Sequence, residues 1–342
     1  MAKNRRTLDT RQTHFVAWLE SVDLKVEDLD GKQLTTNNLV LACYTLHLCS
    51  GNTILCKAIL SNTVKLYLRA AGQLYTSRGF PNPAFDICGR TAASIQEGLN
   101  EMRRWEQVKD RREPLTWEMV EYQQTIAASA EPDSLDDAIA DWLVLGMYTG
   151  FRLSEWAQPD ASLKRTNTFQ RNRDGSSTAI TAQDIIFSIK NNPHLFDVRW
   201  RFQKNGANGQ RITFSNNVAR NRCPLQAAMR ITQRAQRLGI PLDNPLAVFL
   251  DQGSPSFITD VNITFILRRA ASQVYKINKA DELKVWTSHS IRIGACVALH
   301  GAGADFLTLK QRLRWKSDTF FMYLRNTPQL ALEHSRLFEP PV

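Results

Sequence analysis

The sequence predicts a mainly α-helical chain with one small antiparallel β-sheet, arranged as two domains of which the second is α+β. The chain has 342 residues, which is more than a single hydrophobic core usually organises. Apolar residues recur at helical spacing along most of it, and strand character is confined to residues 179–214. Because 43% of the residues are hydrophobic, ordinary cores can form and wholesale disorder is excluded.

Helices fill the predicted first domain, residues 1–110. The clearest segment is SNTVKLYLRAAGQLYTSRGFPNP, residues 61–83, where a Ser-Asn-Thr start precedes apolar residues at helical spacing, and Gly79 and Pro81 end the pattern. No strand signal appears in this domain. We expect its four helices within residues 10–22, 35–51, 61–83 and 90–110.

A charged stretch that contains a proline, KDRREPLT at residues 109–116, marks the boundary between the domains. We take 111–116 as the linker and 117–342 as the second domain. Its strands are expected within 179–190, 197–204 and 210–214, the last two joined by the turn signal NGANG. Helices surround this sheet, and we expect them within residues 115–126, 134–156 (broken at Gly150), 224–239, 259–275, 288–303, 305–315 and 328–338.

The net charge of +10 is concentrated in one segment. Between residues 160 and 240, 14 lysines and arginines stand against four acids, and the rest of the chain is neutral overall. A positive surface of this density attracts a polyanion, most often nucleic acid. A basic face that only contacts solvent is the alternative.

Cysteine usage and hydropathy indicate an intracellular, soluble protein. Six cysteines are present without a C-x-x-C pair or zinc-like spacing, so we expect reduced, mostly buried thiols and no metal site. The apolar run at 138–150 is too short to span a membrane and contains an aspartate. The N-terminus lacks the apolar core of a signal peptide.

Two short motifs combine charged residues with helical spacing. In TGFRLSEW, residues 149–156, Arg152 precedes Glu155 by three residues, so the two side chains share a helix face, and a structural ion pair is the simplest interpretation. In TSHSIRIGACVALHGAG, Ser288 as an N-cap would place His289 and Arg292 on one face of an otherwise apolar helix. That polar pair must face a cavity or a ligand, unless His289 is simply satisfied near the helix start.

Taken together, these segments resemble the tyrosine recombinase (phage integrase) family. The family's marks are an arginine in a TG-x-R-x-x-E setting, a lysine on a β-hairpin, an H-x-x-R helix, then a histidine or tryptophan, and finally a tyrosine. The resemblance covers about residues 115–340. The first domain also resembles the family's helical core-binding domain, most clearly in the segment at residues 61–83. In chain order the matching residues are Arg152 with Glu155, Lys204, His289 with Arg292, Trp315 and Tyr323.

The chain departs from the family's pattern in three places. Trp315 stands where histidine is commoner. The interval from Trp315 to Tyr323 is slightly shorter than usual, which puts the placement of the Tyr323 helix in question. Lys190, at the end of an adjacent strand, competes with Lys204 for the lysine role. The phrases HSIRIGACVALHGAG and LRWKSDTFFMYLRN resemble recombinases of crypton-type eukaryotic mobile elements.

The resemblance implies that Tyr323 attacks a DNA phosphodiester and forms a 3′-phosphotyrosyl link. Arg152 and Arg292 would hold the phosphate oxygens through forked hydrogen bonds. His289 is suited to proton transfer or to a further hydrogen bond, and the Trp315 indole N–H can donate to the phosphate.

The remaining two matched residues would assist this reaction. Lys204 would protonate the leaving 5′-oxygen from its hairpin, and Glu155 would orient a neighbouring cation or His289. Because the adduct keeps the energy of the broken bond, neither ATP nor a metal is needed, and no cofactor is expected. The absence of a P-loop motif fits this expectation.

The sequence therefore predicts a site-specific DNA recombinase or integrase that works as a homotetramer on two double-stranded DNA sites, in a two-domain C-shaped clamp. The helix at 328–338 would dock on a neighbouring subunit, with packing on its own domain as the alternative. No membrane is involved, and the location is intracellular: nuclear for a eukaryotic mobile element, otherwise cytoplasmic or nucleoid. DNA contacts are expected from Lys65, Arg69, Arg199, Arg201, Arg211, Arg220 and Arg222.

Three alternatives stay open. A sequence-specific DNA-binding protein of recombinase descent would no longer cut, and the complete set of catalytic residue types argues against it. A type IB topoisomerase would relax supercoils without a specific site. An RNA-binding protein is disfavoured because the strands lack a clear aromatic stacking motif. The target sequence, the direction of recombination and the accessory proteins are not predicted.

Overall fold

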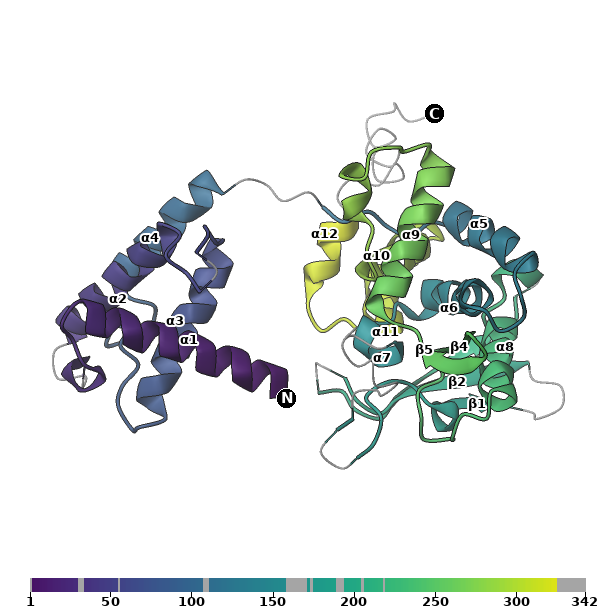
Figure 1. Ribbon diagram of the computed structural model, residues 1–342, viewed down its shortest axis with the longest axis horizontal. Coiled ribbons are helices and arrows are strands. Elements are labelled where there is room, and N and C mark those ends of the chain that lie inside the picture. Colours follow the sequence, from purple (N-terminus) through teal and green to yellow (C-terminus); the bar gives the residue numbers. More distant parts are fainter. Residues whose placement is uncertain are drawn as a thin grey trace, which may run out of the picture. The chain divides into compact units, whose positions relative to one another are not determined.

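The chain folds into two compact units, Met1–Lys109 and Asp110–Val342, each with its own hydrophobic core (Figure 1). Among the residues described, no helix is long and apolar enough to cross a membrane. The computed structural model describes residues 2–29, 34–54, 56–106, 111–157, 171–172, 175–188, 194–203, 206–217 and 219–324.

The first unit is helical, as predicted. Helix α1 packs against α3, and α2 packs against α4. Aromatic rings fill the space between them, with the centroids of Phe15 and Tyr44 4.9 Å apart and both side chains fully buried. Its elements are α1 (Ala2–Ser21), a 3-10 turn (Val26–Leu29), α2 (Leu34–Cys49), α3 (Ser61–Thr76) and α4 (Ala93–Trp105).

The second unit is organised around one buried helix, α6 (Leu135–Thr149). Every residue from Ala138 to Met147 is buried, because α6 is almost entirely apolar and has helices on several sides. It begins at the Ser134 side chain, which accepts the Asp137 N–H, and ends at Gly150 in the left-handed conformation (φ 54°). The other helices are α5 (Trp117–Ala128), α7 (Leu153–Trp156), α8 (Pro224–Arg237), α9 (Asp260–Tyr275), α10 (His289–Gly301), α11 (Phe306–Leu313) and α12 (Phe321–Leu324).

The predicted three-stranded sheet is present in the second unit. Its strands are β1 (Ile185–Phe187), β2 (Leu195–Trp200) and β3 (Gln210–Ser215), antiparallel in that order. Alternate residues of β2 and β3 face the core, where Phe196 pairs with Phe214. On the opposite face, Arg199 pairs with Arg211.

A second hairpin was not predicted. Strands β4 (Val248–Asp251) and β5 (Ser254–Phe257) are joined by Gln252 and Gly253, which both have positive φ, as a tight two-residue turn requires. Each strand is short, and Pro255 within β5 weakens the strand signal.

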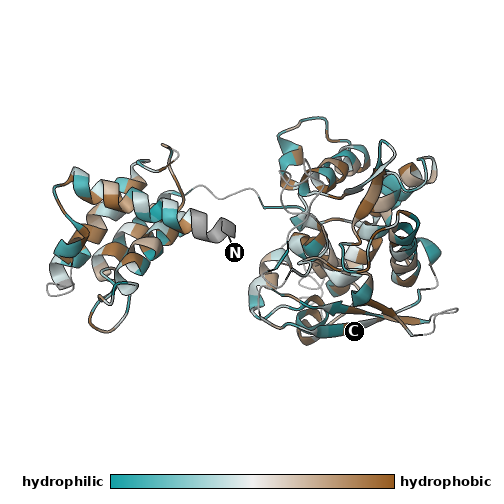
Figure 2. Ribbon diagram, turned by 60° about the horizontal axis from the view of Figure 1, so that its bottom comes forward, coloured by the Kyte–Doolittle hydropathy of each residue, from teal (hydrophilic) through white to brown (hydrophobic). Residues whose placement is uncertain are grey.

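The prediction of mostly buried thiols was wrong. Only Cys223 and Cys296 are buried, whereas Cys43, Cys56 and Cys88 are exposed. The exposed ones belong to the small first unit, whose limited core cannot cover every apolar position. Figure 2 shows hydrophobic and hydrophilic residues alternating along the helices of both units, as expected for helices that bury one face.

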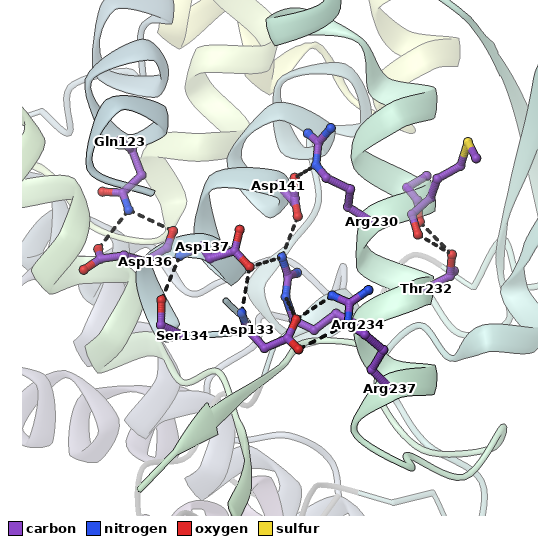
Figure 3. Close-up of polar contacts among 12 residues, drawn as sticks. Gln123, Asp133, Ser134, Asp136, Asp137, Asp141, Arg230, Thr232, Arg234 and Arg237 are labelled. Atoms are coloured by element: carbon purple, nitrogen blue, oxygen red, sulfur yellow. Dashed lines mark hydrogen bonds and ion pairs between the residues drawn. The ribbon is translucent and has the colours of Figure 1, made fainter. Parts of the chain in front are cut away.

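An ion-pair cluster joins α6 to α8 and uses part of the basic segment predicted to attract nucleic acid (Figure 3). The guanidinium of Arg234 is 2% exposed and contacts Asp137 at 3.0 Å and Asp141 at 2.7 Å. It also pairs with Asp133 at 3.4 Å. The same acids pair with two further arginines of α8, Arg230 and Arg237. These three positive charges therefore balance acids within the unit.

Candidate active site

Helix α10 carries His289 and Arg292 on one face, as its spacing predicts. The expected cap at Ser288 was wrong: its backbone is helical (φ −51°) and its side chain makes no capping hydrogen bond. Instead, Ser290 Oγ accepts the N–H of Thr287 at 3.1 Å. The helix itself begins at His289, directly after Ser288, as the sequence pattern predicts.

Tyr323 lies between His289 and Trp315. Its phenolic oxygen is 2.8 Å from His289 Nε2, and the ring centroids of these residues are 5.8 Å apart. The Trp315 ring lies on another side, 5.6 Å from the tyrosine ring. The three residues come from α12, α10 and the turn after α11, so the fold brings together residues that are separated along the chain.

Arg292 is buried beneath this group. Its guanidinium donates to the backbone carbonyls of Gly150 and Leu313, the latter at 3.0 Å, and lies over the Trp315 ring at 4.2 Å. Burial and the neighbouring arginine charges lower the pKa of Arg292 to about 9. It therefore remains charged at neutral pH, although only 2% of the residue is exposed.

Arg152 and Glu155 form the ion pair that their spacing predicts. Arg152 precedes α7, its Nη1 lies 2.7 Å from Glu155 Oε1, and its backbone N–H donates to Oε2 at 3.0 Å. The side chain of Arg152 is 25% exposed, whereas that of Glu155 is only 5% exposed. Arg152 is thus the more accessible of the two predicted phosphate-binding arginines.

Sequence reasoning missed Arg314. Its buried guanidinium donates to Glu155 Oε2 at 2.7 Å and to the carbonyl of Thr149 at 2.8 Å, and it lies 3.8 Å above the ring of Trp200. These partners are far from Arg314 in sequence, so no local pattern indicates them. Its position in LRW, directly before Trp315, was the only available signal.

Arg112 was also missed. It lies in the segment that we took as the linker, and its Nη1 donates to Thr287 Oγ at 3.0 Å beside the start of α10. Hydrogen bonds from Glu113 to Val285 and from Leu115 to Ser290 hold this segment against the second unit. An exposed cation therefore lies near His289, which no motif in the sequence indicates.

The protonation equilibria of His289 and Tyr323 are shifted in opposite directions. Burial, together with the charges of Arg112 and Arg292, lowers the pKa of His289 to about 4. Burial raises the pKa of Tyr323, against the opposing charge of Arg292. Both groups are therefore neutral at neutral pH, and the imidazole is free to accept a proton.

The indole N–H of Trp315 is buried and has no hydrogen-bond partner within the described parts of the chain. A buried donor without a partner carries a desolvation cost, which a hydrogen bond to a ligand would offset. The buried indole N–H groups of Trp142 and Trp200 also lack a partner among the described residues, so the position of Trp315 beside Tyr323 is what makes its N–H relevant here. Within the described ranges, no group of three or more metal-binding side chains is placed to hold an ion.

The other predicted site residues are separate from this group or lie outside the description. Lys204 and its competitor Lys190 both fall outside the described residues, as does the segment 328–338. On the outer face of the sheet, Arg199 and Arg201 both pair with the buried Asp184, at 3.2 and 2.9 Å. These two arginines are held in place by an internal carboxylate.

The remaining predicted DNA-binding residues differ in whether they form ion pairs with other described residues. Arg211 and Arg220 are exposed and form no ion pair with any residue that the structure describes. Arg222 pairs with Glu121 at 2.6 Å and lies over Trp117. In the first unit, Lys65 and Arg69 are exposed one helical turn apart on α3 and line the same pocket.

Comparison with known proteins identifies the fold. No family model and no curated protein matches the sequence. Among solved structures, the site-specific recombinase XerH in a post-cleavage complex with a palindromic difH substrate matches with a TM-score of 0.50 and 14% identity, over 89% of this chain and 72% of that one.

Two further structures are similar at lower TM-scores. The Tn1549 transposon integrase in complex with circular intermediate DNA has a TM-score of 0.43 and 16% identity, over 90% of this chain and 86% of that one. XerA recombinase has a TM-score of 0.39 and 14% identity, over 98% and 100%. These proteins are tyrosine recombinases. The match to XerH shows that this chain has their fold, mainly helical with small antiparallel sheets.

Proposed function

We propose that the protein is a site-specific DNA recombinase that cleaves and rejoins DNA through a 3′-phosphotyrosyl intermediate, with Tyr323 as the nucleophile. The observation that supports this most is the arrangement around one phenolic group: His289 at hydrogen-bonding distance, Trp315 beside it and Arg292 beneath. A tyrosine that only fills a core needs no such set of neighbours.

The first step is attack by the phenolic oxygen of Tyr323 on the scissile phosphorus. As the new O–P bond forms, the phenolic proton passes to Nε2 of His289, which is neutral at working pH because its pKa is low. This requires the tautomer of His289 that carries its proton on Nδ1. The bond from phosphorus to the 5′-oxygen breaks at the same time. The leaving 5′-oxygen takes up a proton, and we assign the donation of that proton to Lys204.

The negative charge that develops on the phosphate needs donors that are already in place. Arg152 and Arg292 supply two guanidinium charges, and the unpaired indole N–H of Trp315 supplies one further donor. Each preorganised donor of this kind is worth about 3 kcal/mol in the transition state. Rejoining runs the same steps in reverse, with a different 5′-hydroxyl as the attacking group.

Double-stranded DNA is the proposed partner. The structurally similar XerH is described in complex with a palindromic difH substrate. Arg211 and Arg220 are exposed cations that form no ion pair with the described part of the chain, and they are suited to phosphate contacts. A homotetramer on two sites, a docking role for the segment 328–338 and a mobile-element origin of the crypton type complete the proposal.

A covalent-adduct assay tests the function. Nicked, end-labelled DNA from the sequences flanking the gene is incubated with wild type, Tyr323→Phe and Arg292→Ala, and the products are separated on denaturing gels. We expect a slow protein–DNA band with wild type alone. Tyr122→Phe serves as the matched control, because Tyr122 is a half-buried tyrosine that packs against the core of the same unit.

Each outcome has a distinct meaning. An adduct that persists in Tyr323→Phe would overturn the assignment of the nucleophile. Salt-sensitive binding without an adduct, on a panel of flanking sequences, would favour the non-cleaving DNA-binding protein. Relaxation of a plasmid that lacks those sequences would favour the topoisomerase.

A further inference from the structure

We propose that Arg314 is a positioning residue that fixes Glu155 and, through it, the guanidinium of Arg152. The inference rests on the proposed function, because Arg152 is the more exposed of the two arginines expected to hold the scissile phosphate. Arg314 itself is fully buried and so does not touch DNA.

The backbone at Arg314 favours a different residue type. Arg314 ends α11 in the left-handed conformation, with φ at +58°, and its N–H donates to the carbonyl of Lys310. Glycine adopts this conformation without steric cost, whereas a residue with a Cβ atom is strained there. What arginine offers at this position is its side chain.

That side chain connects three segments. It donates to the carbonyl of Thr149 at the end of α6 and to Glu155 in α7, and it stacks on Trp200 of β2. A single planar guanidinium can satisfy a carboxylate, a carbonyl and an aromatic face together, which a lysine cannot do. The turn that begins at Thr149 and carries Arg152 is therefore attached to the end of α11.

Glu155 is shared between two arginines. Its Oε1 accepts from Nη1 of Arg152, and its Oε2 accepts both from the Arg152 backbone N–H and from Nη2 of Arg314. Both carboxylate oxygens are thus occupied, which restricts the carboxylate to one orientation. Because Arg152 bonds to Oε1 of this group, its own guanidinium is aimed by that orientation.

The charge balance around Glu155 supports this role. Three cations face it from three elements: Arg152 before α7, Arg292 on α10 and Arg314 after α11. Asp184 and its two ion-pair partners, Arg199 and Arg201, line the same small pocket as Glu155. Burial alone would raise the pKa of Glu155, but the nearby arginines, Arg314 foremost, keep it below its usual range. Removal of Arg314 should therefore raise this pKa.

The test compares Arg314→Gly and Arg314→Lys with wild type. Glycine relieves the backbone strain while removing the guanidinium, so a folded variant is expected. Lys276→Gly is the matched control, since Lys276 also ends a helix in the left-handed conformation (φ +57°) but has an exposed side chain. Initial rates of adduct formation are measured from pH 5 to 8, and DNA affinity is measured separately.

We expect Arg314→Gly to lower the cleavage rate at pH 7 about tenfold to a hundredfold, the usual effect of a displaced substrate-binding group. The rate should also fall further toward acid pH than in wild type, because protonated Glu155 releases Arg152. The cleavage rate of Arg314→Lys should lie between those of wild type and Arg314→Gly, and the rate of Lys276→Gly should match that of wild type. Wild-type rates in Arg314→Gly, or lower rates with an unchanged pH profile, would overturn the inference.

A second readout needs no catalysis. The carboxyl ¹³C signal of Glu155, assigned by comparison with Glu155→Gln, is titrated in the free protein. The pKa of Glu155 that this titration gives should be higher in Arg314→Gly than in wild type, and it should be unchanged in Lys276→Gly. If wild type forms no adduct, the proposed function fails. The titration then decides by itself whether Arg314 holds Glu155, and an unchanged pKa of Glu155 in Arg314→Gly would reject that role.

Discussion

The phenolic oxygen of Tyr323 lies 2.8 Å from Nε2 of His289, yet the pKa values of the two groups are moved apart in the free protein. Proton transfer from tyrosine to histidine is therefore unfavourable before DNA binds. A phosphate anion beside the imidazole would stabilise its charged form and raise the pKa of His289. We infer that the nucleophile is activated by the substrate, which protects a free protein from side reactions.

The low pKa of His289 predicts a pH-dependent stability. Since this pKa is about 4 in the folded state and about 6.5 in the unfolded chain, the unfolded state binds the proton more tightly. The stability that the neutral imidazole of His289 contributes to the folded state is fully present above pH 6.5 and is lost as the pH falls toward 4. It amounts to roughly 1–2 kcal/mol after allowance for solvent around the half-buried ring.

Urea unfolding of wild type and His289→Gln at pH 7 and at pH 4.5 measures this contribution. The free energy of unfolding of wild type should fall more than that of the variant, which lacks the titrating group. Equal slopes with pH in the two proteins would show that His289 titrates normally in the folded state.

Trp315→Phe should separate packing from chemistry. The indole N–H has no partner within the described chain, so its removal breaks no hydrogen bond in the free protein. We expect a loss of about 1–2 kcal/mol in unfolding free energy from reduced packing against Tyr323 and Arg292. Cleavage should fall about a hundredfold, because one phosphate donor is missing. The adduct assay and thermal unfolding measure the two effects, and an unchanged cleavage rate would remove Trp315 from the site.

Exposed arginines should contribute to DNA binding more than paired ones do. Arg211→Gln and Arg220→Gln should each weaken binding and reduce the slope of log affinity against log salt by about 1. Arg199→Gln should change that slope less and lower stability instead, because it leaves the buried Asp184 with one partner fewer. Fluorescence anisotropy over a series of salt concentrations tests this, and an equal slope change in all three variants would contradict it.

Local patterns predicted helices α1 to α11 and the first sheet because each depends on periodicity within a short window. Helix α12 was not among the expected helices, and the helix expected at 328–338 lies outside the described residues. Spacing alone also placed Arg152 beside Glu155 and His289 near Arg292. The β4–β5 hairpin was hidden by its short strands and by Pro255. Contacts across the chain were not predictable in this way: Arg314 meets Glu155 over a separation of 159 residues, and nothing around either residue indicates the other.

The segment before α5 should be sensitive to the size of one glycine. A methyl group at Gly294 of α10 would overlap the backbone carbonyl of Leu115, which cannot move easily because the Leu115 N–H is bonded to Ser290 at 2.9 Å. Gly294→Ala should therefore lower the unfolding free energy by about 1–3 kcal/mol. Gly98→Ala on α4 is the control, since its nearest neighbour would be 3.6 Å away, and helix propensity should raise stability by about 0.5–1 kcal/mol. An equal loss of unfolding free energy in Gly294→Ala and Gly98→Ala would instead indicate that the protein tolerates alanine poorly at glycine positions in general.

The buried ion cluster of Figure 3 should depend on its central arginine. Arg234→Met leaves the carboxylates of Asp137 and Asp141 without the cation that they share, and Asp141 is itself almost fully buried. We expect a loss of about 3 kcal/mol, because the buried Asp141 then keeps only the half-exposed Arg230, at 2.6 Å, as its cation. Arg237→Gln is the matched control: Arg237 lies on the same helix and pairs with Asp133, but its side chain is 54% exposed, so its loss should cost less than about 1 kcal/mol. Chemical unfolding of the two variants distinguishes these cases. Equal losses would mean that the cluster acts as a solvated surface network, and the α6–α8 contact would then depend on its apolar side chains alone.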